Sequence, residues 1–377
     1  MKIKAAVLHE MGLPQPYAQS QPLHIEEVEL DPSGEGEVLV EIKAAGLCHS
    51  DLSVINGDRP RPTPMALGHE AAGIVTEIGR GVTDFHAGDH VVMVFVPSCG
   101  HCLLCMEGRP ALCEPGFHAN VAGALLSGAR RIHRDGNHIN HHMGVSAFAE
   151  YAVVSRRSLV KVDAELPLDE AALFGCAVLT GVGAVVNTAR VQPGASVAVI
   201  GLGGVGLNAL LGAILTGAQR ILAVDVLEDK LEFALQLGAT DTFDASHEDC
   251  VDEVREATAG GVDYAFEMAG SVKALDLAYR ITRRGGTTVT AGLAHPDHKL
   301  ALQAVSLVAE ERTLRGSYIG SCVPARDVPR FIKLYRQGQL PVNRLMSDHV
   351  GFGGLNAAFD RLASGHTVRQ ILAPGAA

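Results

Sequence analysis

Four of the chain's eight cysteines lie within fifteen residues, at a spacing that suits a metal ion. Four thiolates held close together can enclose Zn2+ in a closed tetrahedral site that leaves no position for a substrate. Disulfide bonds are the alternative, but the N-terminal residues lack the apolar run of a secretory signal. We therefore expect a structural zinc lobe at about residues 97–115, with ligands Cys99, Cys102, Cys105 and Cys113.

Chemistry then requires a second, open site, and three other residues carry suitable side chains. Cys48 follows a strand-like segment at residues 38–43, His69 precedes an alternating apolar segment at residues 71–78, and Cys176 lies in an apolar segment. Two cysteines and one histidine are the ligand set of an open catalytic zinc. Each residue alone also suits a buried thiol or a capping histidine, and spacing does not show that the three meet.

A glycine-rich turn has the context of a dinucleotide-binding loop. A buried strand at residues 197–200 runs into the pattern Gly-x-Gly-x-x-Gly, which opens an apolar helix. The first glycine permits the turn, the second lets the backbone approach a pyrophosphate, and the third lets the helix pack on the strand. The loop consists of Gly201, Leu202, Gly203, Gly204, Val205 and Gly206.

An acidic residue in the next strand indicates which dinucleotide is bound. Asp225 ends the strand at residues 220–225, nineteen residues after Gly206, where a carboxylate can accept hydrogen bonds from ribose hydroxyls. Val226 and Leu227 offer no arginine to neutralise a 2′-phosphate. The sequence therefore favours NAD over NADP.

The elements that must position these residues indicate two kinds of domain. Helix and strand patterns continue to alternate at residues 228–237, 262–267 and 285–291, which predicts a doubly wound parallel sheet. Earlier segments, such as residues 72–78 and 88–95, alternate apolar and polar residues between Gly and Pro, which predicts a mainly β domain. The predicted fold class is α/β, a mainly β domain plus a doubly wound sheet.

Charge and composition exclude several function classes. The 377 residues carry a net charge of −11 without a run of Lys and Arg, so a nucleic acid is a poor partner. Two charge-free stretches, residues 171–189 and 191–219, are broken by glycines and suit buried strand and helix better than membrane spans. We expect a cytoplasmic protein with no membrane partner.

Jointly, these motifs resemble the zinc-dependent medium-chain alcohol dehydrogenases along essentially the whole chain. The resemblance implies a GroES-like catalytic domain at residues 1–177 and 320–377, a Rossmann NAD-binding domain at residues 178–319, and an active site in the cleft between them. The motifs that carry it are Gly46-x-Cys48-His49-Ser50-Asp51, Gly68-His69-Glu70, the four-cysteine lobe, Gly175-Cys176 with Thr180-Gly181, the glycine loop, and residues 364–369 ending in Arg369.

The family implies two Zn2+ per subunit and NAD. The catalytic zinc is implied on Cys48, His69 and Cys176, and the structural zinc on the four-cysteine lobe. Asp51 is expected to orient His69, and Glu70 to lie behind the metal. Cys250 and Cys322 match neither set and look like ordinary thiols.

The same match implies further cofactor contacts and a proton relay. His49 and Arg369 match positions that contact the pyrophosphate, Thr180 is implied near the nicotinamide, and Lys230 near the adenosine ribose. Ser50 is expected to accept the alcohol proton and pass it to the cofactor ribose. Many relatives end this relay on a histidine where this chain has Ser53, so its terminal base is water or His49.

The segment between Cys113 and Tyr151 looks like the long loop of the dimeric classes, including the glutathione-dependent formaldehyde dehydrogenases. We therefore expect a homodimer. The segment also holds a run of histidines without regular ligand spacing, which we interpret as a solvated loop rather than a third metal site. They are His118, His133, His138, His141 and His142.

Substrate class is less strongly indicated. The glutathione-dependent class carries acids after the position of Gly57, where this chain has Arg59 and Arg61, which would repel the amino end of glutathione. Phe95 matches a pocket-lining position and favours an apolar primary or aromatic alcohol.

The leading hypothesis is therefore an NAD-dependent zinc alcohol dehydrogenase or aldehyde reductase. The alternatives are a glutathione-adduct formaldehyde dehydrogenase and a non-catalytic NAD-binding or zinc-binding protein on the same fold. The second alternative predicts loss of a catalytic ligand, whereas Cys48, His69 and Cys176 are all present.

Overall fold

The computed structural model describes residues 1–375 and divides the chain into two compact units. The first unit comprises Met1–Cys176, Val323–Ile332 and the chain from Asn343 on. The second comprises Ala177–Cys322 and Lys333–Val342. Each unit has its own sheets and core, so the two are described separately.

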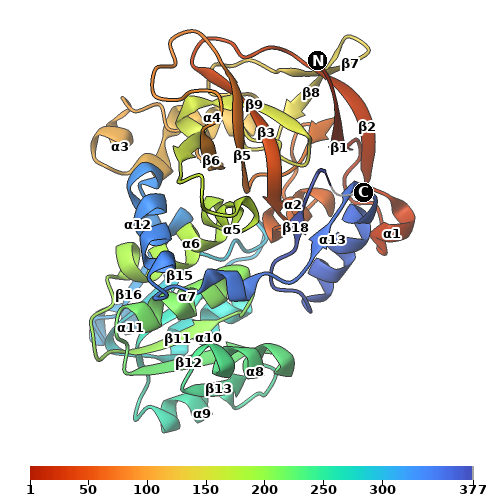
Figure 1. Ribbon diagram of the computed structural model, residues 1–377. Coiled ribbons are helices and arrows are strands. Elements are labelled where there is room, and N and C mark those ends of the chain that lie inside the picture. Colours follow the sequence, from red (N-terminus) through yellow and green to blue (C-terminus); the bar gives the residue numbers. More distant parts are fainter. Residues whose placement is uncertain (376–377) are drawn as a thin grey trace. The chain divides into compact units, whose positions relative to one another are not determined.

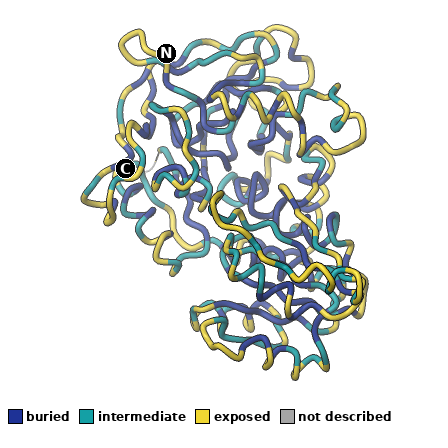
Figure 2. The backbone as a smooth tube through the Cα atoms, turned by 180° about the vertical axis from the view of Figure 1, so that it is seen from behind, coloured by how far each residue is buried: buried dark blue, intermediate teal, exposed yellow. Residues whose placement is uncertain are grey.

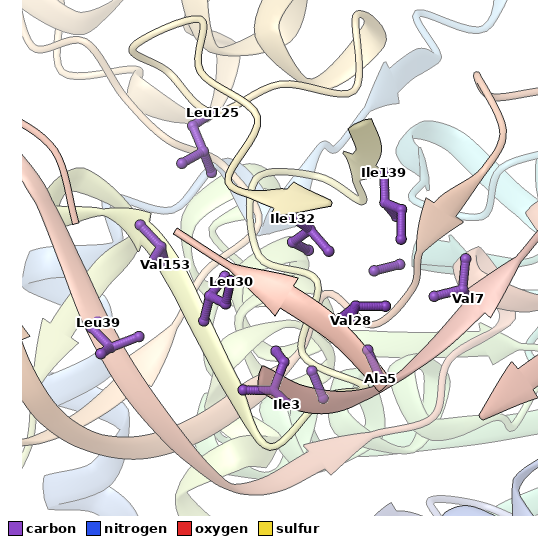
Figure 3. Close-up of a cluster of buried hydrophobic side chains, with 12 residues drawn as sticks. Ile3, Ala5, Val7, Val28, Leu30, Leu39, Leu125, Ile132, Ile139 and Val153 are labelled. Carbon is purple, nitrogen blue, oxygen red and sulfur yellow. The ribbon is translucent and has the colours of Figure 1, made fainter. Parts of the chain in front are cut away.

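A closed five-stranded barrel forms one part of the first unit (Figure 1). Its strand order is β1, β2, β7, β8 and β4, and all neighbours pair antiparallel except β4 with β8. Apolar side chains from these strands form a buried cluster with Leu39 and Val153 of neighbouring strands, and Ile3, Val28 and Ile139 are among its members (Figure 3). The bounds are β1 Lys2–Leu8, β2 Leu23–Leu30, β4 Met65–Ala66, β7 Ile132–Arg134 and β8 Asn137–His141.

A second sheet carries the segments that the sequence associates with metal binding. β3 pairs with β5, β9 and β18, and β18 comes from the far end of the chain to pair with Ala45 and Gly46. This pairing closes the edge of the strand that leads into Cys48. The bounds are β3 Glu37–Gly46, β5 Ala71–Ile78, β6 His90–Met93, β9 Tyr151–Ser155, β10 Leu159–Lys161, β17 His349–Val350 and β18 Ile371–Leu372.

Short helices join the strands of the first unit. The α-helices are α1 Tyr17–Ser20, α2 His49–Ile55, α3 Leu103–Met106, α4 Glu114–Val121, α5 Leu168–Ala172 and α13 Leu355–Ser364. The single 3-10 turns are η1 Pro110–Leu112, η2 Arg156–Ser158, η3 Leu173–Gly175 and η7 Phe352–Gly354. Helix α12 (Pro324–Arg336) and turn η6 (Val342–Leu345) contain two of the four points where the chain passes between units.

The second unit is built on one six-stranded parallel sheet, which confirms the predicted doubly wound fold. Its strand order is β13, β12, β11, β14, β15 and β16, so the order reverses between β11 and β14, where such folds bind ligands. The strands are β11 Ser196–Ile200, β12 Arg220–Asp225, β13 Asp241–Asp244, β14 Val262–Glu267, β15 Thr282–Thr290 and β16 Thr313–Gly316.

Helices cover this sheet because its central strands are apolar on both faces. Strand residues such as Ile200, Leu222 and Val224 are buried in one hydrophobic cluster with Val254 of α9 and Ile281 of α10. Figure 2 shows the backbone coloured by the burial of each residue. The helical segments are α6 Ala177–Gly183, η4 Ala184–Ala189, α7 Gly204–Leu215, α8 Glu228–Leu237, α9 Cys250–Ala257, α10 Val272–Ile281, α11 Ala304–Ala309 and η5 Ile319–Ser321.

The two charge-free stretches differ in structure. Residues 171–189 are helical except for a break at Cys176, whereas residues 191–219 form β11 and α7, the strand and helix that the sequence suggests. Within residues 1–375 no single helix has the length and apolar character to cross a membrane. One broken helical pair, Leu168–Gly175 with Ala177–Ala189, passes that test on length and composition alone.

Candidate active site and metal centres

Cys48, His69 and Cys176 lie together in the first unit. Their ligand atoms and a carboxylate oxygen of Glu70 lie within 4.8 Å of one another, and all four residues are buried. Cys48 follows β3 and begins α2, His69 follows β4, and Cys176 follows η3. The sequence indicates each of these positions but not their meeting, which depends on the pairing of β3 with β5.

A close approach at Gly175 helps to bring Cys176 to the cluster. A Cβ atom at this position would lie 2.5 Å from the carbonyl oxygen of Met93 on β6. Only glycine lets the turn before Cys176 lie this close to the strand.

The donor set fits a zinc ion. His69 Nε2 is buried and has no hydrogen-bond partner among residues 1–375. A buried polar atom without a partner costs about 1–3 kcal/mol, so a ligand at this nitrogen would remove an unfavourable term. Two sulfurs and one imidazole nitrogen are preferred zinc donors.

The titratable groups of the cluster shift one another's pKa values in different directions. A hydrogen bond from Cys176 and the nearby His69 hold the pKa of Cys48 well below its usual value, despite burial. The same bond, together with burial, raises the pKa of Cys176. Burial alone would lower the pKa of His69, but the Asp51 carboxylate and Cys48 raise it well above 6.5. Metal binding must therefore displace protons from His69 and Cys176.

Asp51 orients His69 as the sequence suggests for a carboxylate behind a metal ligand. Asp51 Oδ1 lies 3.0 Å from His69 Nδ1, and its Oδ2 accepts a 3.3 Å hydrogen bond from the Cys48 amide. Its side chain is completely buried. A histidine that donates from Nδ1 keeps Nε2 free to bind a metal.

Glu70 and Arg369 form a buried ion pair behind the cluster. Arg369 Nη1 donates to Glu70 Oε2 at 3.1 Å and to the Leu47 carbonyl oxygen at 2.9 Å. Burial raises the pKa of Glu70 to about 7 although Arg369 opposes it. Arg369 is only 3% exposed. Its guanidinium links Leu47, the residue before Cys48, to Glu70, the residue after His69. Its implied contact with a pyrophosphate stays a prediction.

Two of the loop histidines contradict the solvated-loop interpretation. His141 and His142 are 0% and 1% exposed. His141 Nε2 accepts the Arg131 amide at 3.0 Å, and His142 Nδ1 lies 3.2 Å from Asp51 Oδ1. The run of histidines suggests a solvated loop. The sequence signal for burial was the alternation in β8, which places Ile139 and His141 on the same, buried face of the strand.

The relay candidates lie on α2. Ser50 is half-buried in the first turn of the helix, next to the exposed His49. Ser53 donates its hydroxyl to the His49 carbonyl oxygen at 2.8 Å, the helical back-bond that serine often makes. Ser53 is therefore engaged within its own helix.

The four lobe cysteines also meet, with their sulfurs within 4.8 Å of one another. Backbone amides support the sulfurs, since Cys99 and Gly116 donate to Cys113 Sγ and Cys102 donates to Cys99 Sγ. The amide of Cys105 lowers the pKa of Cys102 to about 6. All eight cysteines of the described chain are free, so the disulfide alternative for the lobe is wrong in this structure.

The glycine loop and Asp225 meet in the second unit. Gly203 is the N-cap residue that precedes α7. Asp225 Oδ2 accepts the Leu202 amide at 2.6 Å, and Oδ1 accepts the Val226 amide at 2.8 Å. These bonds hold the carboxylate beside the amino end of the helix, which attracts phosphate. Lys230 is half-buried on α8, and Thr180 is buried on α6.

We expect substitutions at two glycines of the loop to have different effects, one on the stability of the fold and the other on cofactor binding. A Cβ at Gly206 would overlap the Gly201 carbonyl oxygen, whereas one at Gly203 meets nothing within 4 Å. Gly206→Ala should lower the free energy of unfolding by about 2–3 kcal/mol. Gly203→Ala should leave it within about 0.5 kcal/mol but weaken NAD binding by about tenfold. Denaturant unfolding and NAD titration check both, and equal stability of the two variants would contradict the packing argument.

Comparison with known proteins gives one consistent family. The model of the alcohol dehydrogenase GroES-like domain matches residues 34–164, and that of the zinc-binding dehydrogenase matches residues 204–337. The chain is 38% identical to a putative alcohol dehydrogenase D of Mycobacterium tuberculosis, over 99% of this chain and 100% of the relative. It is 37% identical to an S-(hydroxymethyl)glutathione dehydrogenase of Synechocystis, with the same coverage.

A solved structure agrees with these sequence matches. Benzyl alcohol dehydrogenase from Acinetobacter calcoaceticus superimposes with a TM-score of 0.92 at 33% identity, and the match covers 99% of both chains. The agreement extends over both units of the fold, not one domain alone.

Proposed function

Since the chain belongs to the zinc-dependent medium-chain alcohol dehydrogenase family, we propose that it transfers a hydride between a primary or aromatic alcohol, or its aldehyde, and NAD. The observation that carries this proposal is the buried cluster of Cys48, His69 and Cys176 with an unpartnered His69 Nε2. A regulatory protein on this fold has no need to keep all three donors together.

The chain's residues would divide the chemistry among them. Zinc held by Cys48, His69 and Cys176 would supply a Lewis acid that makes an alcohol hydroxyl more acidic or a carbonyl more electrophilic. Asp51 keeps the His69 proton on Nδ1, and two thiolates offset the charge of the ion. The ion pair of Glu70 and Arg369 fixes the backbone at Leu47.

The second unit supports NAD as the hydride acceptor. The amino end of α7 offers backbone amides to a pyrophosphate, and Asp225 is bonded to the loop that leads into this helix, so we expect its carboxylate to accept hydrogen bonds from a ribose diol. Asp225 would repel the 2′-phosphate of NADP, and the adjacent Val226 and Leu227 cannot compensate.

Proton transfer is assigned to Ser50 rather than Ser53. Ser50→Ala should lower kcat by roughly a hundredfold to a thousandfold because the alcohol proton loses its acceptor, whereas Ser53→Ala should stay within about threefold. Steady-state kinetics across pH, together with metal content, check the pair. Full turnover of Ser50→Ala at every pH with intact metal content would refute the relay.

The substrate class rests on two observations. Phe95 packs edge-on against the His69 ring, with centroids 5.3 Å apart, so an apolar aromatic surface borders the candidate metal ligand. The similarity to a benzyl alcohol dehydrogenase also favours aromatic alcohols. The relative that acts on S-(hydroxymethyl)glutathione keeps the glutathione adduct as a second candidate, which Arg59 and Arg61 disfavour.

We further propose a cytoplasmic homodimer. The eight free cysteines suit a reducing compartment. In the second unit, β16 is an edge strand, and α11 exposes Val305 and Val308 at 69% and 81%. Unpaired strand edges and exposed apolar side chains are features that proteins commonly cover by association.

One set of measurements tests the function. We would measure metal content per subunit, molecular mass by light scattering, and NAD reduction with aliphatic, aromatic and thiol-adduct alcohols. Two zincs, a mass near twice 39.6 kDa and turnover of aromatic alcohols are expected. A preference for hydroxymethylglutathione would select the alternative, and one zinc without turnover would overturn the enzymatic proposal.

A further inference from the structure

His142 is a buried imidazole beside the candidate metal cluster for which the preceding proposal gives no role. It follows β8 and is 1% exposed. Its ring meets the His69 ring edge-on with centroids 5.5 Å apart. Together with Asp51 and His69 it forms a second group of ligand atoms within 4.8 Å of one another.

The Asp51 carboxylate lies between the two imidazoles. Asp51 Oδ1 is 3.0 Å from His69 Nδ1 and 3.2 Å from His142 Nδ1, so both rings approach the same oxygen. Asp51 Oδ2 is held by the Cys48 amide. Both oxygens of the Asp51 carboxylate therefore have fixed neighbours. The amide that donates to Oδ2 belongs to Cys48, which is itself a candidate metal ligand.

The buried position of His142 is energetically unfavourable in itself. Within residues 1–375 neither ring nitrogen has an aligned hydrogen bond, since the contact with Asp51 is short but not straight. The flanking turn places Met143 and Ser146 at φ 51° and 53°, which disfavours both side chains, and the Ser146 hydroxyl accepts the His142 amide at 2.9 Å. Strained backbone and poorly paired buried groups persist where a functional arrangement requires them.

We propose that His142 is a positioning residue that shares the Asp51 carboxylate with His69 and thereby keeps His69 Nε2 directed at the metal. This inference rests on the proposed metal site and deepens it. Without His142, Asp51 can rotate toward the vacated space, and His69 loses the fixed acceptor that sets its ring orientation. Partners behind a metal ligand of this kind raise metal affinity by orienting the ligand. Short contacts that are poorly aligned without a ligand often straighten when the site is loaded.

Three substitutions separate this role from simple packing. His142→Phe keeps an aromatic ring but removes the donor, His142→Asn keeps a donor where Nδ1 stands, and His142→Gln places its amide one carbon farther out. In the holoenzyme, we expect chelator to remove the Cys48-site metal roughly 10–100-fold faster from the Phe and Gln variants than from wild type. We expect the Asn variant to stay within about threefold of wild type, since it keeps an outer partner for Asp51.

A second readout reports the geometry directly. After cobalt replaces zinc, the visible bands of the Cys48 site should shift in the Phe and Gln variants and stay as in wild type in the Asn variant. The four-cysteine lobe provides an internal control, because its metal should leave at the wild-type rate in all three. Thermal melting establishes that each variant is folded.

The outcomes distinguish this inference from the function it rests on. Wild-type metal loss from the Phe and Gln variants, or equal acceleration in the Asn and Phe variants, would overturn the role of His142. A wild-type protein that binds metal at Cys48 but oxidises no alcohol would overturn only the proposed function. A wild-type protein without metal at Cys48 would overturn both.

Discussion

Cys176→Ser should abolish alcohol oxidation while leaving the protein folded. Serine is nearly isosteric with cysteine, and Cys176 is only 5% exposed, so packing changes little. A neutral hydroxyl is a far weaker zinc donor than a thiolate, because it neither ionises near neutral pH nor offers a soft atom. If the metal contributes several kcal/mol to the transition state, kcat/KM should fall at least about a thousandfold, equivalent to about 4 kcal/mol.

Cys322 supplies the matched control for this substitution. It is also fully buried, and its thiol donates to the Leu179 carbonyl oxygen, but it belongs to neither metal cluster. Cys322→Ser should keep two metals and near-normal turnover, whereas Cys176→Ser should keep one metal. Unchanged kcat/KM in Cys176→Ser would show that the Cys48 cluster is not the catalytic centre.

Loss of a lobe cysteine should act on stability rather than on chemistry. The lobe has little core of its own, since Leu103 and Met106 are 64% and 69% exposed, and its four sulfurs lie within 4.8 Å of one another, where a metal would join them. Structural zinc sites contribute folding free energy directly. A loss of a few kcal/mol should lower the melting temperature of Cys102→Ser by roughly 10 °C.

A substitution next to Cys102 separates the effect of losing the lobe metal from the effect of disturbing helix α3. Leu103→Ala adjoins Cys102 on α3 but removes only an exposed side chain, so its melting temperature should stay within about 2 °C of wild type. Below its melting temperature, Cys102→Ser should retain the catalytic metal and measurable turnover. If Cys102→Ser loses the lobe metal without any decrease in melting temperature, the lobe metal is not structural.

The features that the sequence predicts best are those carried by contiguous residues. Strand β11, the glycine loop and helix α7 follow one another along the chain, so their pattern specifies the local geometry before any tertiary contact. The parallel, doubly wound character of the sheet follows from the same alternation of strands and helices. The four-cysteine lobe is local for the same reason.

The features that the sequence predicts poorly depend on distant partners. Cys48, His69 and Cys176 are brought together by strand pairing, and the sequence supplied their grouping only through a family resemblance. The ion pair of Glu70 and Arg369 joins residues 299 positions apart, and no local pattern encodes it. The absence of regular ligand spacing predicts a solvated loop for His142, yet the residue is buried beside Asp51.

The pairing of β18 with β3 bears on how the enzyme matures during synthesis. Arg369 and Leu47, joined by a hydrogen bond, lie 322 positions apart, so a ribosome must add the 322 residues that follow Leu47 before this bond can form. Until then the edge of β3 beside Cys48 is open and Glu70 has no buried cation. A nascent chain that bound metal at Cys48 would therefore lack the hydrogen bonds that Arg369 makes to Leu47 and Glu70. Secure loading of the proposed catalytic centre is therefore expected only after Arg369 has been made, whereas the residues of the four-cysteine lobe are made much earlier and can bind the proposed structural ion sooner.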